Sequence, residues 1–204
     1  MKLRGLYAIT PERADRAALL RAVAQALEGG IAMLQYRRKG LQDLGEARTL
    51  ARMCRDRGVP FIINDNIGIA IASGADGAHL GRDDGDLAAA RGKLQGRILG
   101  VSCYDSLAAA RAATTAGADY IAFGSVFPSP TKPSALRAPL ALFGDARSLG
   151  VPLVAIGGIT LRNAPQLIAA GADCLAVITD LFGAEDIVET ARAYGKLFHH
   201  DHTK

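Results

Sequence analysis

"GADGAHL" (residues 74–80), "GADYIAF" (117–123) and "GADCLAV" (171–177) are three versions of one phrase, and this phrase decides the fold. Each version follows an alanine-rich stretch of helical character and leads into an apolar run. A glycine at the first position suits the left-handed residue that closes a helix, and the chain then enters a strand. The phrase therefore predicts three junctions between a helix and a strand, and it is not a binding motif.

Counting outward from these junctions gives eight short apolar runs separated by helical stretches. Continuously apolar strands that alternate with helices are typical of a parallel sheet covered by helices. Eight such units predict an α/β fold, a (β/α)8 TIM barrel, with a single domain over residues 1–198 and a polar tail over 199–204. The alternative, an open doubly wound sheet, lacks a GxGxxG fingerprint after the first strand. The eight runs are LYAI (6–9), MLQYR (33–37), FIIN (61–64), GAHL (77–80), ILGVS (98–102), YIAFGSV (120–126), LVAIGG (153–158) and LAVIT (175–179).

Composition and charge argue against several classes of protein. The formal net charge is +4 with interspersed charges, without the basic stripe and interleaved aromatics of a nucleic-acid binder. Cys54, Cys103 and Cys174 are odd in number and lack CxxC spacing, so they predict neither a disulfide framework nor a zinc site. No apolar run approaches the roughly 18 residues of a membrane span, so we expect a cytoplasmic protein. Whether it forms a homo-oligomer stays open.

In a barrel of this kind the chemistry lies at the C-terminal ends of the strands, and polar residues interrupt the apolar runs there. The second run ends in "QYRRK" (35–39). A period of two puts Gln35, Arg37 and Lys39 on one face, and Tyr36 and Arg38 on the other. An amide and two cations that point the same way predict an anion site, and the alternative is a solvated strand end.

The third and fourth runs end in carboxylates. Asn64 and Asp65 close "FIIND" (61–65), and Asp84 closes "HLGRDD" (79–84). Carboxylates at neighbouring strand ends suit Mg²⁺, which takes one or two carboxylates together with waters and substrate phosphates. The alternative is a helix N-cap, a role that we expect for Asp86. We interpret His79 as a packed or capping histidine.

The remaining strand ends carry groups that suit phosphate. Ser102 is the last residue of the fifth run, and the proline-rich loop 123–135 presents Ser129, Thr131 and Lys132. Gly158 ends the seventh run, where backbone N–H groups commonly bind phosphate in such barrels. Two anion sites at one mouth predict an enzyme that joins two phosphorylated small molecules and releases diphosphate.

At this point the chain resembles the thiamine phosphate synthase family. The motifs "LYAIT", "QYRRK", "FIIND", "GADGAHLGRDD", "GVS", "VFPSPTK", "VAIGGIT" and "AVIT" occur in the family's order between residues 6 and 179. The resemblance implies that the protein joins 4-amino-2-methyl-5-hydroxymethylpyrimidine diphosphate to (carboxy)hydroxyethylthiazole phosphate. Thiamine phosphate and diphosphate would be the products, with Mg²⁺ as cofactor and a pyrimidine carbocation trapped by the thiazole nitrogen.

The same resemblance assigns roles to particular residues. Those that would hold the pyrimidine diphosphate are Gln35, Tyr36, Arg37, Arg38, Lys39, Asn64, Ser102 and Lys132, of which Arg37, Lys39, Ser102 and Lys132 would act in catalysis. Those that would hold Mg²⁺ are Asp65 and Asp84. Those that would hold the thiazole phosphate are Ser129, Pro130, Thr131, Gly158, Ile178 and Thr179.

The sequence departs from the family pattern at four places. Ser129 and Thr179 exchange one hydroxyl residue for another, and Arg38 replaces an acidic residue, which predicts a more positive site. Tyr104 and Asp105 stand near a position that is often His. The related thiazole tautomerases use such a His, so its absence favours the synthase. The rival hypotheses are an isomerase of that kind and a non-catalytic barrel that binds a thiamine precursor.

Overall fold

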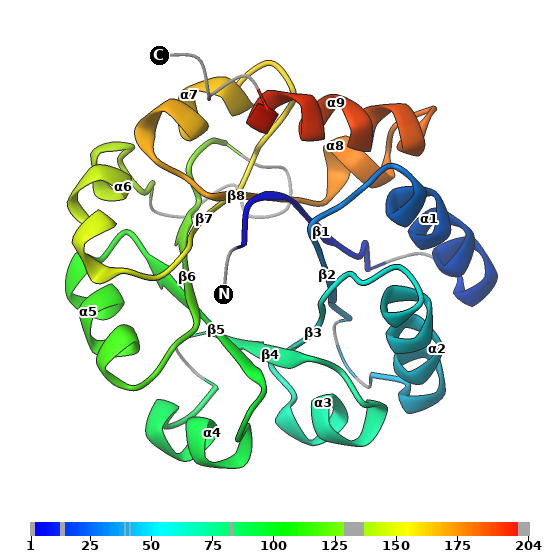
Figure 1. Cartoon of the computed structure of the whole chain (residues 1–204), viewed down its shortest axis with the longest axis horizontal. Coiled ribbons are helices and arrows are strands. Elements are labelled where there is room, and N and C mark those ends of the chain that lie inside the picture. The colour runs from blue at the N-terminus through cyan, green and yellow to red at the C-terminus, as the bar shows by residue number, and fades with distance from the viewer. Residues whose placement is uncertain are drawn as a thin grey trace.

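The computed structural model describes residues 3–12, 15–38, 40, 42–81, 84–128 and 137–199. Eight parallel strands close into a barrel in chain order, because β8 pairs back with β1 and Gly5 lies opposite Cys174. Figure 1 shows the helices as a ring around this barrel, so the predicted (β/α)8 fold is confirmed. The strands are β1 (Gly5–Ile9), β2 (Met33–Tyr36), β3 (Phe61–Asn64), β4 (Gly77–Leu80), β5 (Ile98–Tyr104), β6 (Tyr120–Gly124), β7 (Leu153–Ile156) and β8 (Cys174–Val177).

Several helices begin at a polar cap, and Asp86 caps its helix as predicted by accepting from the Ala89 N–H at 2.9 Å. The last helix includes His199, one residue beyond the predicted domain limit, and residues 200–204 lie outside the described part of the chain. Among the helices described, none is long and apolar enough to span a membrane. The helices are α1 (Arg16–Glu28), α2 (Leu44–Arg55), α3 (Ile67–Ser73), α4 (Leu87–Lys93), α5 (Leu107–Thr115), α6 (Ala141–Asp145), the 3-10 turn η1 (Arg147–Leu149), α7 (Ala164–Ala170), α8 (Thr179–Phe182) and α9 (Ile187–His199).

The repeated phrase acts at the helix–strand junctions as predicted, and its glycines have positive φ angles. The φ values are 75° at Gly74, 90° at Gly117 and 113° at Gly171, a conformation that costs glycine little. The aspartate two residues later exchanges two hydrogen bonds with one residue near the start of the preceding strand. Its N–H donates to that residue's carbonyl, and its carboxylate accepts from that residue's N–H. The pairs are Asp76 with Phe61 (2.8 and 2.8 Å), Asp119 with Leu99 (2.7 and 2.7 Å) and Asp173 with Leu153 (2.8 and 2.9 Å).

Two apolar cores hold the barrel together. The larger lies between the strands and the helices, and the smaller fills the barrel interior with residues such as Met33, Ile62 and Val154. Gly100 makes room in the interior for the ring of Tyr120, because a Cβ on Gly100 would lie 2.0 Å from Tyr120 Cζ. Strand ends above this packed interior are the places where polar side chains can gather.

Candidate active site

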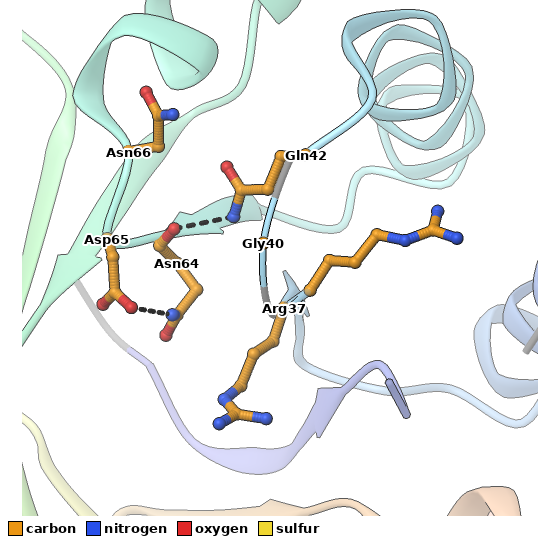
Figure 2. A pocket seen from close by; sticks show the side chains of 7 residues that line it. Arg37, Gly40, Gln42, Asn64, Asp65 and Asn66 are labelled. Carbon is orange, nitrogen blue, oxygen red and sulfur yellow. Dashed lines mark hydrogen bonds between the residues drawn. The ribbon is translucent and has the colours of Figure 1, made fainter. Parts of the chain in front are cut away.

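A pocket of about 370 Å³ opens beside the C-terminal ends of β2 and β3 (Figure 2). Four of the predicted site residues that follow or end these strands line it (Arg37, Arg38, Asn64 and Asp65), so the structure brings them together. The lining residues are Arg37, Arg38, Gly40, Gln42, Asn64, Asp65 and Asn66.

Arg37 has its backbone fixed by the strand beside it. Thr10, which follows β1 and is 1% exposed, accepts from the Arg37 N–H at 2.8 Å and donates to the Arg37 carbonyl at 3.1 Å. The Arg37 guanidinium forms an ion pair with Glu12. It also lies close enough to Asp65 to counteract the rise in that group's pKa. Arg37 therefore brings a guanidinium, paired with Glu12, to the mouth on the side that the alternation along "QYRRK" predicts.

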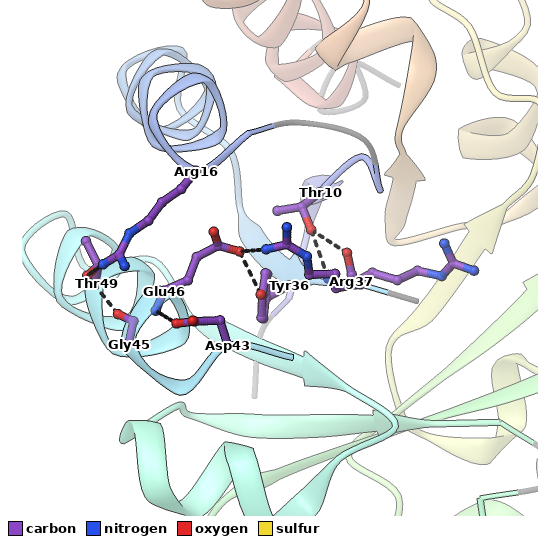
Figure 3. Close-up of polar contacts among 9 residues, drawn as sticks. Thr10, Arg16, Tyr36, Arg37, Asp43, Gly45, Glu46 and Thr49 are labelled. Carbon is purple, nitrogen blue, oxygen red and sulfur yellow. Dashed lines mark hydrogen bonds and ion pairs between the residues drawn. The ribbon is translucent and has the colours of Figure 1, made fainter. Parts of the chain in front are cut away.

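Tyr36 points the other way, toward α2 (Figure 3). The Arg38 guanidinium also reaches that helix, because it bonds Glu46. The Tyr36 hydroxyl donates to Glu46 Oε1 at 2.6 Å, and Arg38 Nη1 donates to the same oxygen at 2.7 Å. Glu46 is 1% exposed, so these two donors balance a buried carboxylate. The charge of Arg38 is thereby paired, and the structure does not bear out the more positive site expected from it. A role for Tyr36 and Arg38 in substrate binding stays a prediction.

Asp65 and Asp84 face each other across the ends of β3 and β4. Burial, a hydrogen bond that the protonated Asp65 donates to Asp84, and the negative charge of Asp84 raise the pKa of Asp65 to about 6, against the opposing charge of Arg37. Asp65 is held with φ 61°, and its N–H donates to the His79 carbonyl at 2.8 Å. Asp84 Oδ2 accepts from the Gly81 N–H at 2.5 Å. The two carboxylates are therefore crowded, which is the condition that a divalent cation relieves.

Asn64 stands beside this pair, and its side-chain amide donates to Asp65 (Figure 2). Its backbone carbonyl accepts from Gln42 Nε2 at 2.8 Å. Tyr104 lies near Asp84, because a Cβ on Gly81 would lie 3.1 Å from Asp84 Oδ2 and 3.3 Å from the Tyr104 hydroxyl. The Tyr104 hydroxyl and the Asp84 carboxylate are therefore close to each other.

A row of polar side chains crosses the barrel interior just below the mouth. Gln35 Nε2 donates to the Tyr7 hydroxyl at 2.7 Å, and that hydroxyl lies 2.8 Å from the hydroxyl of Tyr120. His79 Nδ1 lies 3.0 Å from the Tyr120 hydroxyl, and His79 Nε2 lies 2.8 Å from Ser102 Oγ. Burial lowers the pKa of His79 to about 4, so the ring is neutral at neutral pH. The interpretation of His79 as a packed histidine holds.

The loop after β7 is built around Gly158. Its φ is 62°, and a Cβ there would lie 2.2 Å from the Pro128 carbonyl oxygen, so a side chain has no room. Its own carbonyl accepts from Asn163 Nδ2 at 3.0 Å. Thr160 belongs to the turn before α7, whose N-cap is Asn163. Ile178 is the N-cap of α8 and Thr179 its first residue, so both lie at the neighbouring strand end.

Five predicted site residues lie outside the described part of the chain, and their roles stay predictions: Lys39, Ser129, Pro130, Thr131 and Lys132. Sequence reasoning missed Thr10 and Glu12, which bind Arg37, and Gln42, which lines the pocket. It also missed the Tyr7–Tyr120 pair. Tyr7 and Tyr120 read as core residues in their runs, and a polar residue at an inward-facing strand position was the available signal.

Comparisons with known proteins agree on one family. The sequence model of the family described as thiamine monophosphate synthase matches residues 6–181. A thiamine-phosphate synthase from Aromatoleum aromaticum is 57% identical over 202 residues, covering 97% of each chain. The corresponding protein of Azoarcus sp. strain BH72 is 55% identical, covering 97% of this chain and 98% of the relative.

Solved structures give the same answer. Thiamine phosphate pyrophosphorylase from Pyrococcus furiosus superposes with a TM-score of 0.86 at 32% identity, over 98% of this chain and 97% of that one. A 3-hexulose-6-phosphate synthase superposes with a TM-score of 0.75 at 16% identity, over 94% of this chain and 99% of that one, which reflects the shared barrel fold alone.

Proposed function

The chain belongs to the thiamine monophosphate synthase family, and from this we propose that its barrel mouth joins two phosphorylated heterocycles. The substrates are 4-amino-2-methyl-5-hydroxymethylpyrimidine diphosphate and (carboxy)hydroxyethylthiazole phosphate. The products are thiamine phosphate and diphosphate, which makes the protein an alkyl-transferring transferase.

The observation that carries the proposal is the crowded carboxylate pair beside a cation. Asp65 and Asp84 share one site with Arg37 close by, and the pKa of Asp65 is raised to about 6 by burial and by Asp84. Within the described residues no third His, Cys, Asp or Glu completes a metal cluster. Two carboxylates fit Mg²⁺, which keeps waters and takes substrate phosphates. Asp65 and Asp84 would hold the ion.

The residues of this chain then act on the leaving group. When bound, Mg²⁺ neutralises charge on the diphosphate. Arg37 adds a second positive charge at the same mouth, and the Ser102 hydroxyl can donate to a phosphate oxygen. Lys39 and Lys132 would add further cations. These groups stabilise the negative charge on the departing diphosphate more than the charge on the intact substrate.

The bond changes follow from this polarity. The bond between the pyrimidine methylene carbon and the diphosphate oxygen breaks, and its electron pair leaves with the oxygen. The thiazole nitrogen then gives its lone pair to the electron-poor methylene carbon and forms the new C–N bond. The thiazole phosphate would be held by the Gly158 backbone, by Ile178 and Thr179, and by residues 129–131. A barrel mouth that excludes water limits capture of the carbocation by water.

One assay tests the proposal. Purified protein is incubated with the two substrates together and singly, with and without Mg²⁺, and free diphosphate is measured. We expect release only when both substrates and Mg²⁺ are present. Mg²⁺-independent conversion of a thiazole substrate alone would favour an isomerase. Binding of either substrate without diphosphate release would favour a non-catalytic barrel.

A further inference from the structure

Five side chains from five strands form one continuous row of hydrogen bonds across the barrel. We call these residues, Gln35, Tyr7, Tyr120, His79 and Ser102, the relay. Its four contacts are between 2.7 and 3.0 Å long. The two ends are the residues expected at the pyrimidine diphosphate, and the proposed chemistry makes no use of the three in the middle.

The middle of the relay is sealed and neutral. Tyr7 is 1% exposed, Tyr120 0% and His79 7%; of the two ends, Gln35 is also buried, at 2% exposed, and Ser102 is half-buried. Both ring nitrogens of His79 contact hydroxyl groups, so the neutral ring has one N–H donor and one acceptor for these two contacts. The Tyr7 and His79 rings lie 5.9 and 5.6 Å from the Tyr120 ring, which limits their movement. Each hydroxyl in the middle has one proton to give, so the relay must run in one direction or the other.

In the first direction every proton points toward Ser102. Gln35 Nε2 donates to Tyr7, Tyr7 to Tyr120, Tyr120 to His79 Nδ1, and His79 Nε2 to Ser102 Oγ. The Ser102 proton is then free to donate to a ligand. Gln35 Oε1, which accepts no hydrogen bond from the described residues, is left as an acceptor at the other end.

In the second direction every proton points toward Gln35. Ser102 gives its proton to His79, and only its lone pairs then face a ligand. Gln35 must turn its amide to accept from Tyr7, so its N–H₂ group becomes the free group. A diphosphate offers only acceptor oxygens and would repel Ser102 in this state. An anion at Ser102 therefore selects the first direction.

We propose that His79, Tyr120 and Tyr7 are positioning residues that couple the two ends of the pyrimidine substrate, so that a diphosphate at Ser102 favours a hydrogen-bond donor at Gln35. This inference rests on the proposed function, because it places the two ends of that substrate at the two ends of the relay. The donor is the exocyclic amino group of the aminopyrimidine. The relay thus selects an amino over an oxo substituent, and it does so most strongly when the diphosphate is present.

The coupling can be measured with four ligands and no change to the two end residues. The ligands are the 4-amino and 4-oxo pyrimidines, each as its diphosphate and as its free 5-hydroxymethyl alcohol, with binding measured by calorimetry at fixed Mg²⁺. For the two diphosphates, the Kd of the 4-oxo ligand is divided by the Kd of the 4-amino ligand, and the same is done for the two alcohols. The coupling is the first of these quotients divided by the second. We expect this ratio to be about tenfold in the unmodified protein, the effect of one hydrogen bond.

Removal of a hydroxyl from the middle of the relay should abolish the coupling. Tyr120→Phe and Tyr7→Phe keep their rings, and each should bring the ratio to about one. Tyr194→Phe is the matched control, since it removes a buried hydroxyl bonded to Asp180 at 2.7 Å and lies outside the relay. It should leave the ratio unchanged. A purely structural role would weaken all four ligands alike and keep the ratio in every variant.

The inference is overturned by a ratio of one in the unmodified protein, or by a ratio that survives in both relay variants. Failure of the proposed function gives a different result, namely no diphosphate release from the aminopyrimidine diphosphate and thiazole phosphate. An unmodified protein that turns over its substrates and shows no coupling refutes the relay alone.

Discussion

Arg37 and Arg38 are neighbours in the sequence and serve opposite sides of the chain after β2. Arg37 lies at the mouth and pairs with Glu12, while Arg38 pairs with Glu46, a buried residue of α2. The alternation of side chains along the backbone thus separates Arg37, for which we propose a role in binding, from Arg38, which pairs with a buried carboxylate. The two positions offer a matched pair of substitutions.

Arg37→Ala should raise the KM for the pyrimidine diphosphate about 10- to 100-fold, because it removes one charge-assisted contact to an anion. Its melting temperature should change little. Arg38→Ala should do the reverse and lower the free energy of unfolding by about 1–3 kcal/mol, because Glu46 is 1% exposed and loses a donor. Steady-state kinetics and thermal melting separate the two effects. Equal KM changes in both variants would contradict the assignment.

Asp65 combines a left-handed backbone conformation with a carboxylate that we propose as a metal ligand. Its φ of 61° lies in the left-handed region, which asparagine and aspartate tolerate better than other side chains. Asp65→Asn therefore keeps the backbone and removes one of two crowded carboxylates. The variant is a clean test of the proposed metal site.

We expect Asp65→Asn to lower turnover about a hundredfold or more at limiting Mg²⁺, in line with the loss of one preorganised electrostatic group. Without metal the same variant should melt at the same temperature as the unmodified protein or slightly higher, since repulsion from Asp84 is relieved. Unchanged turnover at limiting Mg²⁺ would remove Asp65 from the metal site. A large fall in melting temperature would instead assign it a structural role.

At the scale of elements, the three residues of the repeated "GAD" phrase end one helix, lead into the next strand and bond to the strand before that helix. The glycine ends the helix with positive φ, and the aspartate pairs through both its N–H and its carboxylate with the preceding strand. The carboxylate thus accepts from a backbone N–H near the start of the preceding strand, which would otherwise need a water as its acceptor. These contacts fix the register of β4, β6 and β8 against their predecessors.

Asp173→Ala should lower the free energy of unfolding by about 1.5–3 kcal/mol, because the Leu153 N–H loses a charged acceptor at 2.9 Å. The KM values for both substrates should stay the same, since this end of the barrel lies opposite the mouth. Denaturant melts provide the measurement. Asp56→Ala, at an exposed position after α2, is the control and should change stability by no more than about 0.5 kcal/mol.

At the scale of the whole molecule, barrel closure puts Gln35, Tyr7, Tyr120, His79 and Ser102 into one row although they are spread over residues 7–120. The row needs space in the interior, and Gly100 supplies it beside the ring of Tyr120. Packing of the whole barrel therefore sets the geometry of the polar row.

Gly100→Ala should destabilise the barrel by about 1–3 kcal/mol, because the added Cβ would lie 2.0 Å from Tyr120 Cζ and the ring has no free volume to enter. Turnover should also fall, since Tyr120 is displaced from His79. Gly92→Ala is the control in α4, where an added Cβ meets no atom within 4 Å. That change should raise stability by about 0.5–1 kcal/mol. Melting curves that show the same shift for both variants would refute the packing argument.

Much of the fold and part of the site could be read from local signals. The glycines of the repeated phrase, the eight apolar runs and the polar residues at the strand ends all express preferences of a few adjacent residues. These preferences predict the barrel, the inward side of Arg37 and the carboxylates of Asp65 and Asp84. The structure bears out the barrel and brings these three side chains to one mouth.

What the sequence by itself determined is therefore the order of the elements and the face on which each polar residue lies. Tertiary structure alone decided which of these residues meet. Examples are the ion pair of Arg38 with Glu46, the hydrogen bonds between Thr10 and Arg37, and the row from Gln35 to Ser102. The partners in these contacts are 8 to 41 positions apart in sequence, except Tyr7 and Tyr120, which are 113 positions apart. The physical reason is that periodicity fixes the direction of a side chain, whereas its partner depends on the closure, register and packing of all eight strands.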